Sequence, residues 1–188
     1  FWSGNYKIVK NIVKHLKSHS LQIIVANGRA EKDKKKIDKL KVPANIKLLN
    51  YGFSKDVDLL MSAADIIIGK AGGVSVTESL NKFLPMVCCK KLPEQERVNV
   101  EMLVSEGAAK QYKNNKEMIE ILSQLLNDPK LLLQMRENVA RLRRPDATML
   151  LAKDMFECDA IYPEQANIDY SKINKQIKKI LKTKPKQA

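Results

Sequence analysis

The chain has 188 residues, a net charge of +13 at pH 7, 44% hydrophobic residues and three cysteines. No apolar run approaches the roughly 20 residues of a membrane-spanning helix, and no CxxC or His/Cys spacing typical of a metal site is present. Cys88 and Cys89 are adjacent in an apolar strand-like run, so their side chains should point to opposite faces. With Cys158, they fit reduced thiols of a cytosolic protein.

Strand-like apolar runs alternate with segments of helical periodicity along the first 142 residues. We expect strands at 21–26, 46–49, 64–69, 86–89 and 108–112. We expect helices at 6–16, 31–40, 57–63, 74–83, 97–106, 115–127 and 129–142, with Gly107 as a C-cap. This alternation predicts βαβ units and therefore an α/β fold, a Rossmann-like doubly wound parallel sheet. We expect this domain to span residues 1–160 and a basic helix or tail to span 161–188.

The first candidate site is the junction that follows the predicted strand at 64–69. It reads Gly69-Lys70-Ala71-Gly72-Gly73 and continues into a predicted helix. Ligands of open α/β sheets bind outside the carboxyl ends of the strands, and glycines let a backbone approach a ligand closely. The free N–H groups of a helix start favour a phosphate or diphosphate. Ser75 and Thr77 can add hydroxyl donors, and the Glu78 carboxylate suits the paired hydroxyls of a ribose.

The same residues also have a purely structural interpretation. Ser75 and Glu78 have the S-x-x-E spacing of a capping box, which satisfies the N–H groups of a helix start without any ligand. Glycine pairs are common in strand–helix turns, and the GK[ST] order of a P-loop is absent. The local sequence leaves both interpretations open.

Two further loops follow predicted strands. Glu94, Gln95 and Glu96 offer the donors and acceptors that sugar hydroxyls require, although acidic residues also complement the dipole of a helix start without a ligand. Gly52 and Phe53 follow the strand at 46–49, where an aromatic ring can stack on a base. A single phenylalanine is, however, more often part of a core.

The excess of positive charge comes from lysine and is densest at 31–41 and 172–186. It suits an anionic partner such as a nucleotide or an anionic membrane, or it belongs to solvated helix faces. Because no nucleic-acid-binding motif accompanies it, we expect no nucleic acid partner. His15 and His19 lie away from the strand-end loops, so we interpret both as surface residues.

Several motifs occur in order between residues 65 and 109: Gly69-Lys70-Ala71-Gly72-Gly73, Thr77-Glu78, Leu84-Pro85, Pro93-x-Gln95-Glu96-x-x-Asn99 and Gly107-Ala108. Together they resemble the C-terminal domain of GT-B glycosyltransferases, most closely the monogalactosyldiacylglycerol synthases and the bacterial processive diacylglycerol glucosyltransferases. The peptidoglycan GlcNAc transferase is a more distant relative. Arg143-Arg144-Pro145-Asp146-Ala147 is similar to the segment that opens the closing helix of the glycolipid enzymes. The resemblance covers about residues 3–160.

The resemblance implies a UDP-sugar donor substrate and assigns a role to each loop. It places the diphosphate at Gly72, Gly73, Val74 and Ser75, the ribose at Glu78, the uracil at Gly52 and Phe53, and the donor sugar at Gln95, Glu96 and Glu94. Gly4, Thr77 and Asn99 are secondary candidates. No metal or other cofactor is implied, because the helix dipole and the loop donors stabilise the leaving group.

Two departures from the family pattern stand out. Only Ser3-Gly4 remains of the glycine-rich loop before the first helix, whose preceding strand is missing. Glu94 replaces a small residue and adds negative charge near the donor. The acceptor domain and the catalytic base of the family lie upstream of this chain. We therefore expect no catalytic residue here, and a chain that binds donor without completing transfer alone.

The resulting hypothesis is the donor-binding half of a UDP-sugar-dependent hexosyltransferase. Its lipid acceptor, such as diacylglycerol, would be bound by the missing N-terminal domain. The alternative is a stand-alone nucleotide-sugar-binding subunit that acts with a separate acceptor or membrane-anchor protein. We expect a peripheral location on the cytoplasmic face of the membrane, because the basic surface favours anionic lipid. The tail stripe of Ile173, Ile177 and Ile180 suits either a crossing to another domain or a helix on the membrane.

Overall fold

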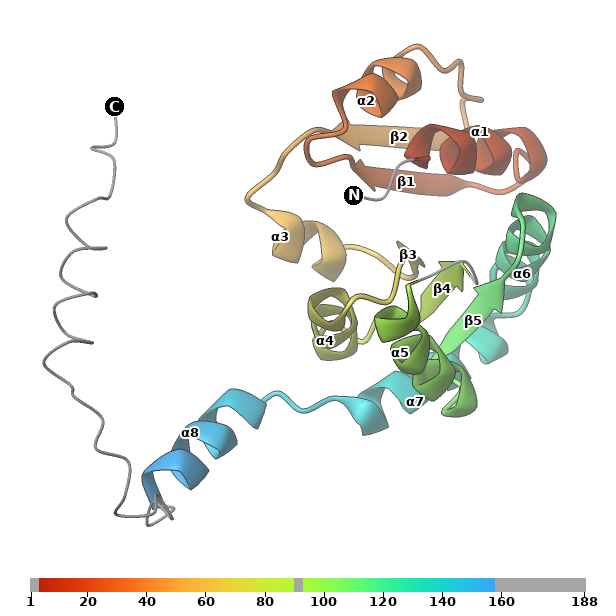
Figure 1. The fold of residues 1–188 in the computed structure, drawn as a ribbon. Coiled ribbons are helices and arrows are strands. Elements are labelled where there is room, and N and C mark those ends of the chain that lie inside the picture. The colour runs from red at the N-terminus through yellow and green to blue at the C-terminus, as the bar shows by residue number, and fades with distance from the viewer. Residues whose placement is uncertain (1–3, 90–92, 158–188) are drawn as a thin grey trace, which may run out of the picture. The chain divides into compact units, whose positions relative to one another are not determined.

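The structure, a computed structural model, describes residues 4–89 and 93–157. The chain divides into two compact units, residues 1–145 and 146–188. Figure 1 shows the elements of the first unit, which are α1 (Asn5–His15), β1 (Leu21–Ala26), α2 (Glu31–Asp38), β2 (Ile46–Tyr51), α3 (Val57–Ser62), β3 (Ile67–Gly69), α4 (Gly73–Asn81), β4 (Met86–Cys89), α5 (Glu94–Ser105), β5 (Ala109–Tyr112), α6 (Asn115–Asn127) and α7 (Pro129–Leu142). The described part of the second unit is α8 (Ala147–Glu157).

The strands pair in parallel, as the alternation of strands and helices predicts. β1 pairs with β2, and β3, β4 and β5 form a second sheet in that order. The α/β class with parallel strands is therefore confirmed. The expected single sheet is divided, because β1 and β3 share no ladder among the described strands.

Hydrophobic periodicity locates the elements well and their ends less well. β1 and β4 have the predicted bounds, whereas β3 is three residues long and shorter than the apolar run that predicts it. α5 begins at Glu94, three residues before its apolar pattern, because Pro93 is its N-cap. Pro93 has φ −56° and ψ 151°, which is extended backbone and cannot extend the helix backwards.

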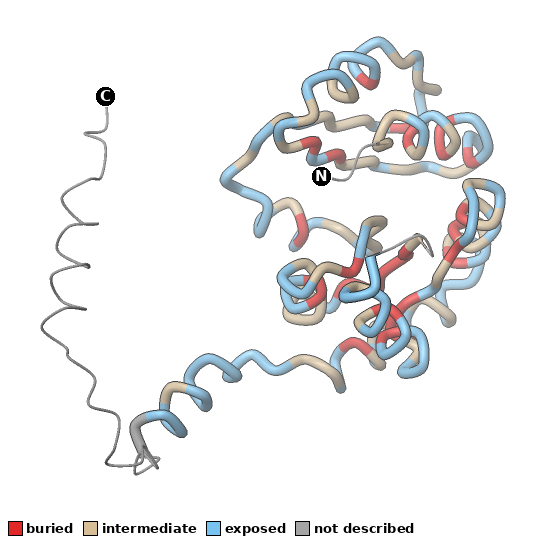
Figure 2. The backbone as a smooth tube through the Cα atoms, viewed as in Figure 1, coloured by how far each residue is buried: buried red, intermediate tan, exposed pale blue. Residues whose placement is uncertain are grey.

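The second sheet buries side chains on both faces. Met86 and Cys88 of β4 pack into a cluster with α4, α5 and α7. Val87 lies in a different cluster with α1 and α6, and Cys89 packs against it. The two cysteines therefore face opposite sides of the sheet, as predicted. Figure 2 shows the buried backbone concentrated along β4, β5 and the inner sides of the helices.

Helix α1 packs with two sets of partners. Val9 and Val13 join a cluster with Val25 of β1 and Ile37 of α2. Ile12 and Leu16 join the cluster that contains Val87 of the second sheet. One helix thus contributes to the core on both sides of the division between the sheets.

The second unit is described only by its helix. α8 begins directly after Asp146, where the similarity to the glycolipid enzymes places a helix start, and the Asp146 carbonyl accepts from Leu150 N–H at 2.8 Å. Its apolar side chains are mostly exposed: Met149, Leu150, Leu151 and Met155. Within the described residues, no helix is long and apolar enough to cross a bilayer. The tail predicted at 161–188 lies outside the described residues.

Gly107 ends α5, as its position after the last periodic residue predicts. Its φ is +68°, and the N–H groups of Gly107 and Ala108 donate to the carbonyls of Val104 and Leu103, at 3.0 and 2.8 Å. This is the double hydrogen bond of a Schellman motif. A Cβ at Gly107 would lie 2.6 Å from Asn138 Nδ2, so α5 and α7 meet closely here.

We predict that Gly107→Ala lowers the free energy of unfolding by more than the matched variant Gly28→Ala. Both glycines have positive φ, but a Cβ at Gly28 has no neighbour within 4 Å. Gly28→Ala should cost only the left-handed backbone, about 1–2 kcal/mol, whereas Gly107→Ala adds the contact with Asn138. Urea unfolding measures both variants, and equal losses would contradict the close approach of α5 and α7.

Candidate functional site

The start of α4 follows directly after β3 and carries no side-chain cap. Gly72 is the N-cap and Gly73 the first helical residue, so Ser75 is the third residue of the helix. A capping box needs its serine at the N-cap, and this structure therefore excludes that interpretation of Ser75 and Glu78. The Thr77 hydroxyl donates backwards to the Gly73 carbonyl at 3.0 Å. Among the described residues, no acceptor meets the N–H groups of Gly73, Val74 and Ser75.

The backbone conformation does not explain the glycines of this turn. Gly72 has φ −66° and ψ 147°, which any residue adopts, and Gly69 and Gly73 have no positive φ. A Cβ at Gly69 or Gly73 would meet nothing within 4 Å, and one at Gly72 would meet only Glu96 Oε1 at 3.6 Å. The missing side chains therefore leave open space beside the free N–H groups.

An ion pair joins this turn to the start of α5. Lys70 Nζ lies 2.6 Å from Glu96 Oε1, and the Glu96 side chain is only 16% exposed. The second carboxylate oxygen, Oε2, is buried and has no hydrogen-bond partner among the described residues. Glu96 thus has one oxygen held by Lys70 and another that can still accept a hydrogen bond.

Asn99 anchors the turn from α5. Its side-chain amide donates to the carbonyl of the fully buried Ala71 at 2.9 Å. This bond satisfies a buried carbonyl and fixes the backbone immediately before the two glycines. Asn99 therefore has a structural role, in addition to its place among the secondary site candidates.

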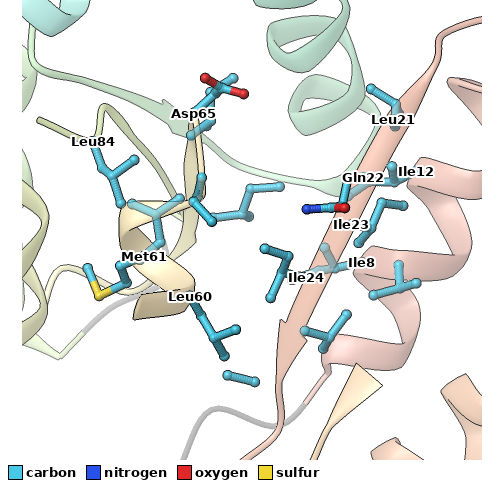
Figure 3. A pocket seen from close by; sticks show the side chains of 18 of the residues that line it. Ile8, Ile12, Leu21, Gln22, Ile23, Ile24, Leu60, Met61, Asp65 and Leu84 are labelled. Carbon is cyan, nitrogen blue, oxygen red and sulfur yellow. The ribbon is translucent and has the colours of Figure 1, made fainter. Parts of the chain in front are cut away.

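Ser75 and Glu78 also line a groove between the two sheets, with a volume of about 810 Å³. We call it the β1–β3 groove, because residues of β1 and β3 line it together with residues of α1 and α3. Figure 3 shows Ile23 and Ile24 of β1 on one side and Leu60 and Met61 of α3 on the other. The groove is mainly apolar, and Glu78 is one of its few ionisable groups.

The other predicted site residues lie on separate loops. Phe53 is 70% exposed, so the core interpretation of this residue is wrong. Gly52 accepts from the Gly28 N–H at 3.1 Å, which joins the loops after β1 and β2. Gln95 and Glu94 are exposed, and Glu94 pairs with Arg97 at 3.1 Å. Among the described residues, no hydrogen bond or ion pair connects Phe53 or Gln95 to the Gly72-Gly73 turn.

A chain of polar side chains at the carboxyl ends of β1 and β2 was not predicted. The Asn5 amide donates to Asn27 at 3.2 Å, Asn27 to Asn50 at 2.7 Å, and Asn50 to Asp38 at 2.7 Å. Hydrogen bonds from Lys34 and then Asn50 lower the pKa of Asp38. In the sequence, Asn27 could have been chosen as a candidate site residue because it directly follows a predicted strand. At the same end of the fold, the Gly4 N–H donates to the Asp33 carboxylate at 2.9 Å.

The Cys88 thiol and the two histidines are not reactive groups of this region. Burial raises the pKa of Cys88 to about 12, with a smaller contribution from Cys89, so the Cys88 thiol stays protonated at neutral pH. His15 is exposed, and His19 lies 3.2 Å from Asn127 Oδ1 on the surface. Both histidines are therefore surface residues, as expected.

Solved structures define the class of this fold. MurG of Acinetobacter baumannii matches with a TM-score of 0.59 and 21% identity, over 77% of this chain and 45% of that one. WaaG, a glycosyltransferase of lipopolysaccharide biosynthesis, matches with a TM-score of 0.53 and 18% identity, over 80% and 43%. The fold is thus the Rossmann-like C-terminal domain of GT-B glycosyltransferases.

The family follows from the sequence. Residues 5–151 match the model of the glycosyltransferase family 28 C-terminal domain, and the chain belongs to this family. It is 27% identical to a processive diacylglycerol beta-glucosyltransferase of Bacillus licheniformis, over 82% of this chain and 42% of that protein. It is 34% identical to a probable monogalactosyldiacylglycerol synthase of Glycine max, over 72% and 26%. The chain thus spans less than half the length of these relatives.

We predict that Asn99→Ala lowers the free energy of unfolding by about 1–3 kcal/mol, because it leaves the buried Ala71 carbonyl unpaired. Asn11→Ala is the matched control, since the Asn11 amide also donates to a backbone carbonyl, but in an exposed position within its own helix. We expect the control to change stability by less than about 0.5 kcal/mol. Urea unfolding of both variants tests this, and losses of similar size would show that Asn99 is not the anchor.

Proposed function

We propose that this chain is the donor-binding half of a UDP-sugar-dependent hexosyltransferase that acts on a lipid acceptor such as diacylglycerol. The observation that carries the proposal is the glycine turn before α4. No positive φ requires these glycines, and their missing side chains adjoin N–H groups that meet no acceptor among the described residues. A diphosphate fits this arrangement, because it is an anion with many acceptor oxygens that needs close backbone approach.

The neighbouring side chains extend the proposed site on both sides of the diphosphate. Glu78 is exposed one turn into α4, where its carboxylate can accept from the two hydroxyls of a ribose. Glu96 has a buried oxygen without a partner, which can accept from a hydroxyl of the donor sugar. Gln95 and Glu94 are exposed beside it, and the exposed Phe53 ring offers a face for uracil.

The proposed chemistry is displacement at the anomeric carbon of the donor sugar. The acceptor oxygen forms a bond to that carbon, and the bond from the carbon to the diphosphate oxygen breaks. The electron pair leaves with UDP, whose developing charge the N–H groups of Gly73, Val74 and Ser75 stabilise. A base outside these residues takes the proton of the acceptor hydroxyl. We assign charge stabilisation to the helix start, so UDP binding is expected to be insensitive to EDTA.

The lipid acceptor is proposed from the relatives. The protein of Bacillus licheniformis is named as a diacylglycerol glucosyltransferase, and that of Glycine max as a monogalactosyldiacylglycerol synthase. A peripheral position at the cytoplasmic face of a membrane fits the net charge of +13. It also fits the exposed apolar residues of α8, which can enter the lipid interface.

We predict that Gly73→Ala weakens UDP binding about tenfold or more without lowering the melting temperature. An alanine at a compatible helical position stabilises the fold by about 0.4–1 kcal/mol, whereas its methyl group obstructs the approach of the diphosphate. Titration calorimetry measures binding, and thermal unfolding measures stability. A Gly73→Ala variant that binds UDP as tightly as the original chain would remove the basis of the proposal.

A second variant, Glu78→Gln, and a second ligand, uridine, distinguish the diphosphate subsite from the ribose subsite. Uridine lacks the diphosphate, so Gly73→Ala should leave uridine binding almost unchanged. Glu78→Gln should weaken both ligands, because both contain the ribose. A Glu78→Gln variant that loses stability but keeps its affinity for UDP would make Glu78 a structural residue.

We predict that the chain floats with vesicles of phosphatidylglycerol and phosphatidylcholine but not with phosphatidylcholine alone. Binding should weaken at high salt, because screening reduces the attraction of lysines to anionic lipid. Leu151→Asp in α8 should reduce binding, and Leu59→Asp, at an equally exposed leucine of α3, should not. Equal flotation with both vesicle types would contradict an electrostatic attachment.

A further inference from the structure

Asn27 is a buried polar residue directly after β1, with 7% of its surface exposed. Its Oδ1 accepts from the Asn5 amide at 3.2 Å, and its Nδ2 donates to Asn50 Oδ1 at 2.7 Å and to the Tyr51 carbonyl at 2.9 Å. Burying an amide is costly unless it is hydrogen-bonded. Here the bonds join the end of β1 to the start of α1 on one side and to the end of β2 on the other.

A group that can only accept sets the direction of this chain of amides. Hydrogen bonds from Lys34 and then Asn50 lower the pKa of Asp38, which is therefore a carboxylate at neutral pH and has no proton to donate. Asn50 must turn its Nδ2 toward Asp38, at 2.7 Å, and toward the Lys34 carbonyl, at 3.0 Å. The Asn50 Oδ1 then faces Asn27, so the Asn27 side chain presents its Nδ2 to β2.

The Asn27 amide acts on the peptide group between Tyr51 and Gly52. The Tyr51 carbonyl accepts from the Asn27 backbone N–H at 3.0 Å as well as from the side chain at 2.9 Å. The backbone bond alone already pairs this oxygen, so the second bond restricts the direction of the carbonyl. In a planar trans peptide the C=O and N–H groups point in opposite directions. Asn27 therefore also fixes the direction of the Gly52 N–H.

The Gly52 N–H is a donor that meets no acceptor among the described residues. It lies directly before Phe53, whose ring is mostly exposed. The Gly52 carbonyl accepts from the Gly28 N–H at 3.1 Å, and Lys34 Cδ lies 3.6 Å from the position that a Cβ on Gly52 would take. The loop after β2 thus presents a free donor and an exposed aromatic ring on a backbone that its neighbours hold in place.

We propose that Asn27 is a positioning residue for the base of the donor. It holds the peptide between Tyr51 and Gly52 so that the Gly52 N–H donates to a carbonyl oxygen of uracil while the base lies on the Phe53 ring. Asn27 acts through this peptide and does not touch the ligand. The inference rests on the proposed function, because it requires that the loop after β2 receives the base. It adds Asn27, which is not among the predicted site residues.

The direction of a single N–H matters for base recognition. A hydrogen bond weakens steeply when its donor is misaligned, and the apparent affinity falls with the fraction of molecules whose loop has the binding conformation. Without the Asn27 amide, the Tyr51 carbonyl keeps its backbone bond but can tilt, and the Gly52 N–H tilts with it. We therefore expect the affinity for ligands that contain uracil to fall about fivefold to tenfold.

Binding of UMP and of ribose 5-phosphate tests the proposal, because the first ligand carries uracil on the same ribose phosphate. We call the dissociation constant of ribose 5-phosphate divided by that of UMP the uracil ratio, and titration calorimetry measures both constants. Asn27→Ala should lower the uracil ratio about fivefold to tenfold, through weaker binding of UMP. Its affinity for ribose 5-phosphate should stay that of the original chain, since the ribose and phosphate subsites lie on α4.

Asn45→Ala is the matched control. The Asn45 amide also donates to two carbonyls, those of Lys17 and His19 at 2.8 and 2.7 Å, but at the amino ends of β1 and β2. We expect this variant to keep the uracil ratio of the original chain, even where it lowers stability. An equal fall of the uracil ratio in both variants would show that a loosened sheet, and not the position of Asn27, weakens binding.

Asp38→Ala provides a second variant in case Asn27→Ala does not fold. Asp38 is exposed, so its removal leaves the core intact. Asn50 then loses the carboxylate that sets the direction of the amides, and the uracil ratio should fall about twofold. If Asn27→Ala does not fold and Asp38→Ala keeps the uracil ratio of the original chain, the proposal is wrong.

The Gly52 amide gives a readout in the original chain. Uridine should shift its NMR resonance and slow its hydrogen exchange, because the N–H gains an acceptor. In Asn27→Ala this shift should shrink, and in Asn45→Ala it should persist.

Two results would overturn the inference and leave the proposed function standing. The first is an unchanged uracil ratio in a folded Asn27→Ala variant, which makes Asn27 a structural residue only. The second is a Gly52 amide that does not respond to uridine although the chain binds UDP. A chain that binds neither UDP nor uridine would remove both the inference and the proposed function.

Discussion

The burial of α1 is the interaction on which the first unit depends. Val9 and Val13 pack toward β1 and α2, and Ile12 and Leu16 pack toward the second sheet. No ladder joins β1 to β3 among the described strands, so these side chains and the cluster around Val87 supply the apolar contact across the division. This packing connects the sheet of β1 and β2 to the sheet of β3, β4 and β5.

The parallel direction of the strands brings the functional loops together within each sheet. In a βαβ chain, every strand ends at the same edge, so each loop that follows a strand faces the same solvent region. The Gly72-Gly73 turn follows β3, the start of α5 follows β4, and the Gly52-Phe53 loop follows β2. Asn99 and Glu96 connect the first two of these loops directly. In the proposed donor site, this arrangement lets short motifs far apart in the sequence serve one ligand.

Much of the fold could be predicted from the sequence, because it depends on local patterns. The periodicity of apolar residues locates β1, β4, α6 and α7, and the left-handed conformation that ends α5 requires a residue such as Gly107. The division of the sheet could not be predicted, since pairing between β1 and β3 depends on long-range geometry that periodicity does not encode.

In the candidate site, too, local features could be predicted from the sequence, whereas long-range contacts could not. The turn at Gly72 and Gly73 was evident from its glycines, but the capping-box alternative could be rejected only once the N-cap was located at Gly72. The Lys70–Glu96 pair spans 26 residues, and neither partner signals the other in the sequence. The asparagine chain through Asn27 and Asn50 likewise depends on the register of β1 and β2.

β1 and β3 each pair with another described strand on one side only. Their other edges affect how readily this polypeptide aggregates in solution. Their residues include Ile23-Ile24-Val25 in β1 and Ile67-Ile68 in β3, which are apolar and uncharged, without the lysine or proline that usually protects an exposed edge. Such edges pair readily with strands of other molecules and so promote aggregation.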